Sequence, residues 1–492
     1  MKPVSLLAIA ATLIQRVAVY ALLLPRNNDA PRVLSLETQR RTPRNPAHRD
    51  KLRKRDTLEV GLDNEETLYF INGTIGTPPR PVRLHIDTGS SDLWVNTPAS
   101  KLCASGGNPC AYAGTYEANS SSTYEYIASN FNISYVDGSG ATGDYVADTV
   151  TIGSQRLNRL QFGIGYSSTN AQGILGVGYP LNEVQVNRAR LQPYSNLPAQ
   201  LVAEGVIQSN AYSLWLNDLD ANTGNILFGG VDTDKYIPPL QSLPIESTTG
   251  VHGEFIITLT NLHLGNRTIG RNSELANPAA TGGGNGNSHS NNPLALAVLL
   301  DTGSSLTYLP DDLVSELYTL LGAVYNATAN AAYIACSAAR SPPPNATHLT
   351  FTFSAPAIAV PLDELVLDLV TAAGVRPTFA DGTPACLFGI APAGAGTYVL
   401  GDTFLRSAYV VYDLENHEIA LAPTLFNSTS TRVMEIGRGK GAVPGVTRVA
   451  NPVKATAGLR GWNASGAVGR RVEGVWKGVV VGVVGVVVLG ML

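Results

Sequence analysis

Basic residues are scarce in the middle of this 492-residue sequence. Residues 56–423 contain 13 Lys and Arg but 33 Asp and Glu, so the net charge of this region is about −20. Residues 1–55 and 424–492, in contrast, carry more basic than acidic residues. Because nucleic-acid binding needs clustered Lys and Arg, this composition argues against such a role for the central region. An acidic surface suits a protein that works at low pH, although it can also serve solubility alone.

Long helical patterns are also scarce. From residue 57 to 423 the sequence alternates apolar and polar residues in runs of four to eight, broken by Gly, Asn, Asp and Pro. This pattern predicts a mostly β fold with few short helices. The clearest expected strands are 67–71, 132–135 and 409–412, and the clearest expected helices are 197–204 and 311–321.

Only four cysteines are present, and their number is even. Pairing of sequence neighbours would join Cys103 to Cys110 and Cys336 to Cys386, although three connectivities are open in principle. Paired cysteines imply an oxidising compartment. Eight N-x-S/T sequons agree with that compartment and are candidate glycosylation sites. They are Asn72, Asn119, Asn132, Asn266, Asn326, Asn345, Asn427 and Asn463.

The N-terminal segment has the pattern of a secretory signal, for which we take residues 1–21. Lys2 precedes an apolar stretch from Val4 to Ile14, and small residues follow. Arg16 interrupts the apolar run shortly after Ile14, so an amphipathic targeting peptide is the alternative.

Residues 22–55 are rich in Arg and Pro and end in the dibasic pair Lys54-Arg55. We interpret them as a propeptide that is cleaved before Asp56. A basic segment over an acidic body can act as an intramolecular inhibitor at neutral pH, because acid would weaken its ion pairs. The alternative is a linker without inhibitory role.

The C-terminal apolar run, residues 478–492, has 15 residues, fewer than the ~20 that a membrane-spanning helix needs. Small residues and a polar spacer precede it within a linker or stalk that we place at 424–477. This order is typical of a GPI-attachment signal, whose tail is replaced by a lipid. A tail-anchored helix is the alternative. The candidate attachment residues are Asn463, Ser465 and Gly466.

The pentapeptide Asp-Thr-Gly-Ser-Ser occurs twice, at 87–91 and 301–305, each time after an apolar run. A Leu-Gly sequence follows each copy at a similar distance, at 175–176 and 400–401. The repeat predicts two homologous lobes, 56–245 and 246–423, which each supply one Asp to a shared cleft. Residues 272–292, rich in Gly and Asn, are expected to form a surface loop in the second lobe.

Two carboxyl groups about 3 Å apart cannot both ionise cheaply, so one stays protonated while the other can activate a water molecule. This chemistry needs no metal, cofactor or covalent nucleophile. The paired turns therefore predict acid proteolysis.

Residues 56–423 resemble the pepsin-like aspartic proteases, and among them the fungal yapsin-type, GPI-anchored enzymes. Besides the two turns, the resemblance rests on Ser-Asp-Leu-Trp-Val at 91–95, Gly-Ile-Leu-Gly-Val-Gly-Tyr-Pro at 173–180 and Gly-Asp-Thr-Phe-Leu-Arg at 401–406. It implies a bilobal, mostly β acid-protease fold with the active site between the lobes. The catalytic residues that it implies are Asp87 and Asp301, and Thr88 and Thr302 would hold the two turns together.

The resemblance also implies a flap, the hairpin at 133–140, that closes over a bound peptide. Tyr135 would hydrogen-bond Trp94, and Val136 stands where many relatives have Gly. Gly89 and Gly303 would let the backbone approach the carboxyls, which Ser90 and Ser304 would orient. The substrate-binding residues that follow are Gly89, Ser90, Trp94, Tyr135, Val136, Asp137, Gly303, Ser304 and Ser305.

We therefore expect a monomeric aspartic endopeptidase that cleaves proteins or peptides. It would be anchored at the outer face of the plasma membrane or in the cell wall. Yapsin-type relatives favour Lys or Arg beside the cut, and Asp137 and Asp144 are candidates to recognise them. The alternatives are a catalytically silent pepsin-like binding protein and a two-carboxylate glycosidase, whose carboxyls would lie at least about 5 Å apart.

Overall fold

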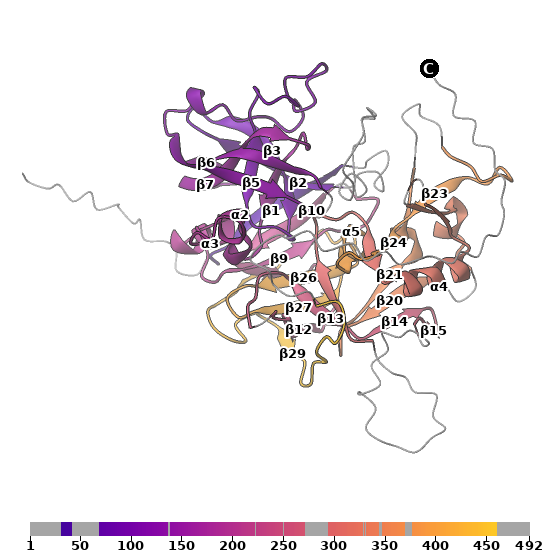
Figure 1. Cartoon of the computed structure of the whole chain (residues 1–492). Helices are drawn as coiled ribbons and strands as arrows, with labels where there is room; N and C mark the ends of the chain where they lie inside the picture. The colour runs from indigo at the N-terminus through magenta and orange to yellow at the C-terminus, as the bar shows by residue number, and fades with distance from the viewer. Residues whose placement is uncertain are drawn as a thin grey trace, which may run out of the picture. The chain divides into compact units, whose positions relative to one another are not determined.

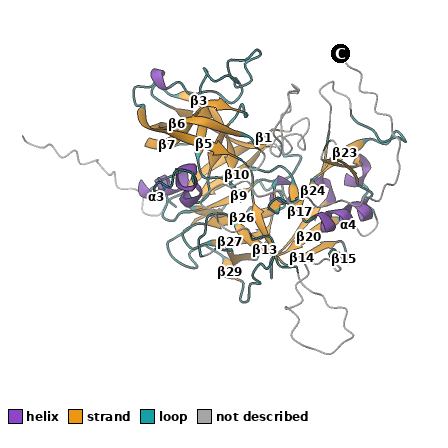
Figure 2. Ribbon diagram, viewed as in Figure 1, coloured by secondary structure: helices purple, strands orange, loops and turns teal. Residues whose placement is uncertain are grey.

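Strands predominate in the structure, a computed structural model, which confirms the predicted mostly β fold (Figure 2). From Arg32 onward the chain forms one compact unit. The residues that the structure describes are 31–41, 68–135, 138–221, 223–248, 250–270, 294–327, 329, 331–343, 347–369 and 376–459.

One large sheet of 14 strands contains most of the first half of the chain and several strands from its end. Its order is β29-β12-β27-β26-β9-β10-β1-β2-β3-β8-β4-β7-β6-β5. Its strands are β1 (Leu34–Arg41), β2 (Leu68–Ile75), β3 (Arg80–Asp87), β4 (Leu93–Asn96), β5 (Glu125–Ser134), β6 (Gly140–Ile152), β7 (Gln155–Ser168), β8 (Gly173–Gly176), β9 (Ala211–Trp215), β10 (Thr223–Phe228), β12 (Leu240–Pro244), β26 (Ala408–Asp413), β27 (Glu418–Pro423) and β29 (Val446–Arg448).

The second half of the chain forms smaller sheets. The orders are β13-β16-β25-β17-β24, β15-β14-β20-β21 and β18-β19-β23-β22, and β11 pairs with β28. The strands are β11 (Gly230–Asp232), β13 (Ile256–Leu259), β14 (Asn261–Leu264), β15 (Arg267–Thr268), β16 (Leu296–Leu300), β17 (Thr307–Leu309), β18 (Val324–Asn326), β19 (Ala331–Ala335), β20 (His348–Thr352), β21 (Ala357–Pro361), β22 (Val366–Leu367), β23 (Ala385–Phe388), β24 (Ile390–Pro392), β25 (Val399–Leu400) and β28 (Val433–Glu435).

The two Asp turns lie in duplicated strand arrangements. In the first half, β3 pairs in parallel with β8, β8 pairs antiparallel with β4, and β4 pairs in parallel with β7. In the second half, β16, β25, β17 and β24 repeat these three pairings in the same order. Strand β8 ends at Gly176 and strand β25 ends at Leu400, so each Leu-Gly sequence lies at the end of an equivalent strand. The matched distance from each Asp turn to its Leu-Gly sequence therefore reflects a duplicated fold.

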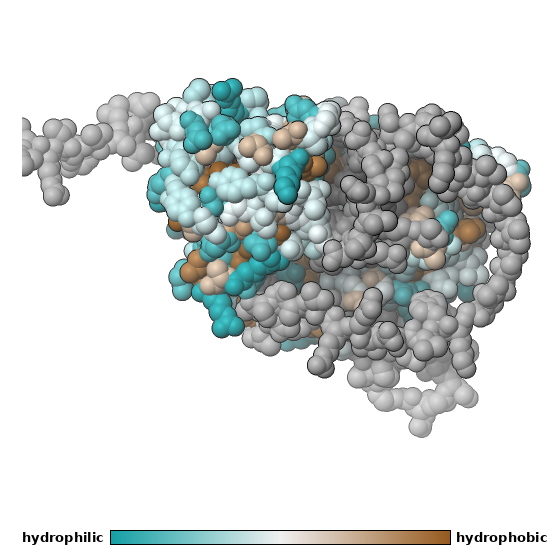
Figure 3. Space-filling view, turned by 45° about the horizontal axis from the view of Figure 1, so that its top comes forward, coloured by the Kyte–Doolittle hydropathy of each residue, from teal (hydrophilic) through white to brown (hydrophobic). Residues whose placement is uncertain are grey.

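Figure 1 shows β2, β3, β5, β6 and β7 gathered on one side and β20, β23, β24 and α4 on the other, with β9 and β26 between them. One apolar cluster runs through both halves and includes Ile86 and Leu175 from the first and Leu300 and Phe404 from the second. The two β-rich halves therefore share a continuous core. On the face seen in Figure 3, the surface of the described residues is mainly hydrophilic.

Helices are few and short in the described residues, as the sequence predicts. The helix α4 spans the predicted residues, and it ends because Gly322 adopts a left-handed conformation with φ 69°. The helix α3 begins after Asn196, whose side chain accepts a hydrogen bond from the backbone N–H of Ala199. The helices are α2 (Val184–Asn187), α3 (Leu197–Ala203), α4 (Asp311–Leu321) and α5 (Asp402–Leu405), with 3-10 turns η1 (Ala118–Ser120), η2 (Pro180–Asn182), η4 (Cys336–Ala339) and η5 (Leu362–Leu365).

Two segments outside the predicted lobes pack into the fold. Strand β1, from the predicted propeptide, lies between β10 and β2 and pairs with β10 from Leu34 to Gln39. The described part of the predicted stalk contains β28 and β29, which pair with β11 and β12. Farther on, Ala457 forms a β-bridge with Leu296 of β16. Contacts with the body therefore continue past Pro423 as far as Ala457.

Candidate active site

The two Asp turns are joined by reciprocal hydrogen bonds between Thr88 and Thr302. The backbone N–H of each threonine donates to the hydroxyl oxygen of the other, at 3.1 and 3.0 Å. Each hydroxyl in turn donates to a backbone carbonyl of the opposite half, Leu300 for Thr88 and Ile86 for Thr302, at 2.9 and 2.8 Å. These four bonds fix one turn against the other.

The turns hold the carboxyl groups of Asp87 and Asp301 in equivalent environments. Each Oδ1 accepts the N–H of the glycine two residues later, at 2.8 Å for Asp87 and 2.7 Å for Asp301. Each Oδ2 accepts a serine hydroxyl, from Ser90 at 2.6 Å and from Ser304 at 2.8 Å. Donors of this kind stabilise a carboxylate and fix its orientation.

The glycines show that the two carboxyls face each other. A Cβ atom added to Gly89 would lie 2.5 Å from Oδ1 of Asp301, and one added to Gly303 would lie 2.6 Å from Oδ1 of Asp87. No side chain fits at those distances, so both positions require glycine. The carboxyls are also buried, with 2% of Asp87 and 8% of Asp301 exposed. The structure thus brings together the two Asp residues that the sequence places 214 positions apart.

The predicted flap lies at the turn between β5 and β6. Buried Trp94 donates its indole Nε1–H to the hydroxyl of Tyr135 at 2.8 Å, the bond that the resemblance implies. The turn is closed by hydrogen bonds between Tyr135 and both Ser139 and Gly138, at 2.8 and 3.0 Å. Val136 and Asp137 lie outside the described residues. Ser305, also predicted to bind substrate, is the last residue of the second turn and is buried.

A buried acidic cluster next to the first turn was missed by the sequence analysis. Asp92 accepts hydrogen bonds from the hydroxyls of Tyr145 and Tyr194, at 2.6 and 2.9 Å, and from the N–H of Val184 at 2.9 Å. Burial raises the pKa of Asp92 despite these donors. The same cause raises the pKa of neighbouring Glu183 to about 10. The signal in the sequence was a charged residue, Asp92, directly before the apolar residues 93–95.

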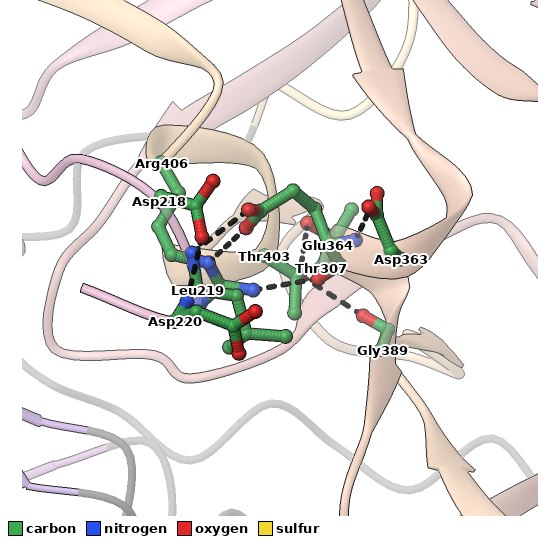
Figure 4. A network of polar contacts seen from close by, with 9 residues as sticks. All are labelled: Asp218, Leu219, Asp220, Thr307, Asp363, Glu364, Gly389, Thr403 and Arg406. Atoms are coloured by element: carbon green, nitrogen blue, oxygen red, sulfur yellow. Dashed lines mark hydrogen bonds and ion pairs between the residues drawn. The ribbon is translucent and has the colours of Figure 1, made fainter. Parts of the chain in front are cut away.

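A second missed feature is a buried ion pair between Arg406 and Glu364 (Figure 4). The guanidinium also donates to the backbone carbonyl of Glu364 at 2.6 Å, while the Glu364 carboxylate accepts the N–H of Leu219 at 2.8 Å. Leu219 lies in the loop after β9, and Arg406 directly follows α5. The network therefore ties the first half of the chain to the segment that follows the second Leu-Gly sequence.

Both disulfides join sequence neighbours, Cys103 to Cys110 and Cys336 to Cys386, with Cα atoms 5.1 and 5.0 Å apart. Of the three possible connectivities, the structure therefore has the neighbour pairing. The sequon asparagines among the described residues are all exposed, whereas Asn345 and Asn463 lie outside those residues. The exposed ones are Asn72, Asn119, Asn132, Asn266, Asn326 and Asn427.

Across the described ranges, no group of three or more His, Cys, Asp and Glu side chains is arranged to hold a metal ion. In the same part of the chain, no helix has the length and apolar character to cross a membrane. The predicted signal, the loop at 272–292, the GPI candidates and the apolar tail all lie outside the described residues.

Comparison with known proteins assigns the family. The family model described as eukaryotic aspartyl protease matches residues 68–424. The chain is 52% identical over 427 residues to "Probable aspartic-type endopeptidase opsB" of Aspergillus oryzae, covering 86% of this chain and 83% of that protein. It is 48% identical over 451 residues to the protein of the same name from Aspergillus fumigatus, covering 91% and 87%.

A more distant relative is "Aspartic proteinase 3" of Saccharomyces cerevisiae, 29% identical over 484 residues, with 83% of this chain and 77% of that protein covered. Among solved structures, aspartic proteinase from Irpex lacteus matches with a TM-score of 0.56 at 20% identity. That match covers 81% of this chain and all of the other, and it supports the two-lobed fold. The chain belongs to the eukaryotic aspartyl protease family.

Proposed function

We propose that this protein is an aspartic-type endopeptidase in which Asp87 and Asp301 form the catalytic dyad. The ionised carboxyl takes a proton from a water molecule, whose oxygen attacks the carbon of the scissile peptide bond. The protonated carboxyl gives its proton to the carbonyl oxygen, and a tetrahedral intermediate forms. Transfer of a proton to the amide nitrogen then breaks the C–N bond and releases two peptides.

The observation that carries this proposal is the facing arrangement of two buried carboxyls on matched turns. Each Oδ1 lies against the glycine of the opposite turn, so the two inner oxygens can share one proton and one water molecule. The shared site means that the two pKa values belong to the pair rather than to either residue. A catalytically silent relative would not need both turns in this geometry.

Cleavage of a mixed peptide library from pH 3 to 7 tests the activity. Asp87→Asn and Asp301→Asn should each reduce cleavage by at least about 1,000-fold, and a statine-type inhibitor should block the wild type. Asp381→Asn, an exposed carboxyl remote in sequence from both turns, is the matched control and should retain activity. Activity that survives Asp87→Asn would overturn the dyad, and a folded wild type without activity would favour the binding protein.

We propose further that residues 22–55 act as an inhibitory propeptide. Support comes from β1, which fills a place in the large sheet two strands from β3, the strand that ends in Asp87. Its Arg40 is partly buried, and burial lowers the pKa of that guanidinium. If Lys54-Arg55 is the processing site, Lys54→Ala combined with Arg55→Ala should yield the longer, inactive form. Full activity of that unprocessed form would contradict the inhibitory role.

Secretion and lipid anchoring are also proposed. Two disulfides and six exposed sequons support passage through an oxidising secretory compartment. We propose attachment of a GPI lipid at Asn463, Ser465 or Gly466, which would hold the enzyme at the plasma membrane or cell wall. Deleting 478–492 should release active enzyme into the medium. Retention at the cell surface after that deletion would contradict the anchor.

The most specific part of the proposal is a preference for substrates with Lys or Arg beside the cleaved peptide bond. The central region has a charge of about −20, and Asp144 lies on the flap strand β6, where it accepts the Tyr166 hydroxyl at 2.9 Å. Asp137→Asn and Asp144→Asn should lower cleavage after Lys relative to Leu. An unchanged ratio in both variants would exclude these two carboxylates.

A further inference from the structure

We propose that His85 is a positioning residue that makes the two carboxyls of the dyad unequal and lowers the pH at which the enzyme becomes active. This inference rests on the proposed function. His85 stands two residues before Asp87 on β3, so both side chains project from the same face of that strand. Its imidazole is buried, and Nε2 lies 3.2 Å from the backbone carbonyl oxygen of Thr302.

This contact fixes where the imidazole carries hydrogen. A carbonyl oxygen has no hydrogen to give, so Nε2 of His85 must be the donor. His85 therefore adds a hydrogen bond from the first catalytic strand to the second catalytic turn. This bond adds to the four bonds made by Thr88 and Thr302. The matching position on the second catalytic strand provides no equivalent bond to the first turn.

The acceptor belongs to a peptide group that itself binds the dyad. The carbonyl of Thr302 and the N–H of Gly303 are the two ends of one peptide unit, and that N–H donates to Oδ1 of Asp301 at 2.7 Å. A donor on the carbonyl polarises the peptide and strengthens the bond made by its N–H. His85 thus stabilises the ionised form of Asp301 through one intervening peptide.

The matching position in the second half shows the asymmetry. Two residues before Asp301 stands Leu299, whose buried side chain has no polar atom to offer the first turn. The peptide between Thr88 and Gly89 therefore lacks the equivalent donor from β16. The structure assigns the stronger stabilisation of negative charge to Asp301, so the shared proton is biased toward Asp87.

No other described carboxylate stands opposite His85 on the strands packed against β3. The positions opposite it are Phe70 on β2 and Ile174 on β8, and the Phe70 ring lies 5.9 Å from the imidazole centroid. The carboxyl groups on β2, β3, β8 and the second turn are those of Asp87 and Asp301, while Tyr69 on β2 and Arg80 and Arg83 on β3 can also ionise.

Two ionisable side chains, Arg83 and Tyr112, lie next to these groups. Arg83, two residues earlier on β3, donates to the side chain of Asn72 at 3.0 Å and stacks on the ring of Tyr112, 4.5 Å from its centroid. Tyr112 in turn packs edge-on against Phe70, at 6.0 Å. The Arg83 guanidinium is thus held by its own partners, and the link from His85 to the dyad runs through the Thr302 peptide.

The test is the pH dependence of kcat/KM in variants that are expressed as the full chain and assayed after processing. His85→Gln and His85→Asn form a matched pair, because the longer Gln amide places a donor near the position of Nε2 and the shorter Asn amide does not. His85→Leu reproduces the residue of the second half. Ile174→Val is the control for altered packing beside His85.

We expect the acid limb of the profile to move about 0.5 unit to higher pH in His85→Leu and His85→Asn, since the ionised dyad loses a stabilising donor. At a pH below both limbs this shift corresponds to about a threefold loss of kcat/KM. His85→Gln should restore the wild-type limb, and Ile174→Val should not move it. If His85→Leu does not fold, the Gln and Asn pair decides the question.

Coincident acid limbs in wild type, Gln and Asn variants would overturn the role of His85 while leaving the dyad in place. Equal shifts in the Gln and Asn variants would also overturn it, because the donor would then not matter. Failure of the proposed function has a different signature, namely no statine-sensitive cleavage by the wild type at any pH.

Discussion

At the scale of single residues, the groups around a position determine which side-chain size or which protonation state the site can accept. Gly89 and Gly303 have no room for a Cβ, because the opposite carboxyl fills that space. Glu183 is fully buried beside Asp92, and its carboxyl therefore holds its proton to high pH. Neither constraint concerns the overall fold, and both affect how the site behaves with pH and substitution.

Gly89→Ala should abolish activity while the protein still folds. The new methyl group would lie 2.5 Å from Oδ1 of Asp301, so the two turns must separate by enough to disrupt the shared proton. We expect a loss of at least about 100-fold in kcat, since a 1 Å displacement in a reacting site costs that much. Gly106→Ala, where a Cβ meets nothing within 4 Å, is the matched control. Equal activity of the two variants would contradict the geometry.

Glu183→Gln should stabilise the protein at neutral pH and leave its stability unchanged at pH 4. The pKa of Glu183 is raised from 4.5 to about 10, so the unfolded chain releases this proton first and stability falls as pH rises above 4.5. At pH 7 the difference amounts to on the order of 3 kcal/mol. The Gln oxygen can still accept the N–H of Tyr194, as Oε2 does at 2.8 Å. Urea unfolding at both pH values measures the effect, and an equal gain at pH 4 would rule out this cause.

At the scale of elements, buried polar links hold segments that are remote in sequence. The ion pair of Arg406 with Glu364 joins the residue after α5 to the turn η5, and Leu219 extends the link to the loop after β9 (Figure 4). Both charged side chains are at most 5% exposed. Such a pair loses much of its attraction to desolvation, but either charge left alone would be costly.

Arg406→Met should destabilise the protein by about 3–5 kcal/mol, because the Glu364 carboxylate would remain buried without its partner. The double variant with Glu364→Leu should cost less than the sum of the two single changes, since no isolated charge remains. Denaturant unfolding of the four proteins gives this cycle. The exposed pair of Arg159 with Glu125 serves as a comparison, and its removal should have a much smaller effect, because solvent screens the two charges. Additive effects at 406 and 364 would count against the coupling.

At the scale of the whole molecule, the fold extends beyond the repeated lobes at both ends. Strand β1 precedes the first lobe by sequence, yet it lies within the large sheet. Beyond Pro423 the chain adds β28 and β29 and reaches β16, the strand that leads to Asp301, through Ala457. The duplicated turns identify the lobes, and these outer segments join strands from both halves.

Ending the chain after Pro423 should destabilise the enzyme strongly, whereas ending it after Leu459 should not. The shorter form loses β28 and β29 and leaves the edges of β11 and β12 unpaired, while the longer form keeps every described contact. Thermal unfolding and activity of the two forms provide the comparison. Equal melting temperatures would show that residues 424–459 add little to stability.

Much of this architecture could be predicted because local patterns carried it. The alternating runs became β2, β5 and β26, the expected helix at 311–321 is α4, and the matched spacing of the turns reflects one strand arrangement used twice. The buried carboxyl of Asp92 and the partner of Arg406 could not be predicted, since each depends on side chains from distant segments. Burial and pairing at long range leave no periodic signal in the sequence.

The sequence by itself determined the chemistry: two Asp-Thr-Gly-Ser-Ser turns and a flap tyrosine with its tryptophan. Each is a short sequence pattern, and its residue types are needed for the chemistry wherever the fold places them. Only the tertiary structure decided that each carboxyl faces the opposite glycine, that β1 and residues 424–459 belong to the sheets, and that His85 contacts the second turn. These facts depend on how two halves meet, because contact between distant segments is set by the packing of the whole core.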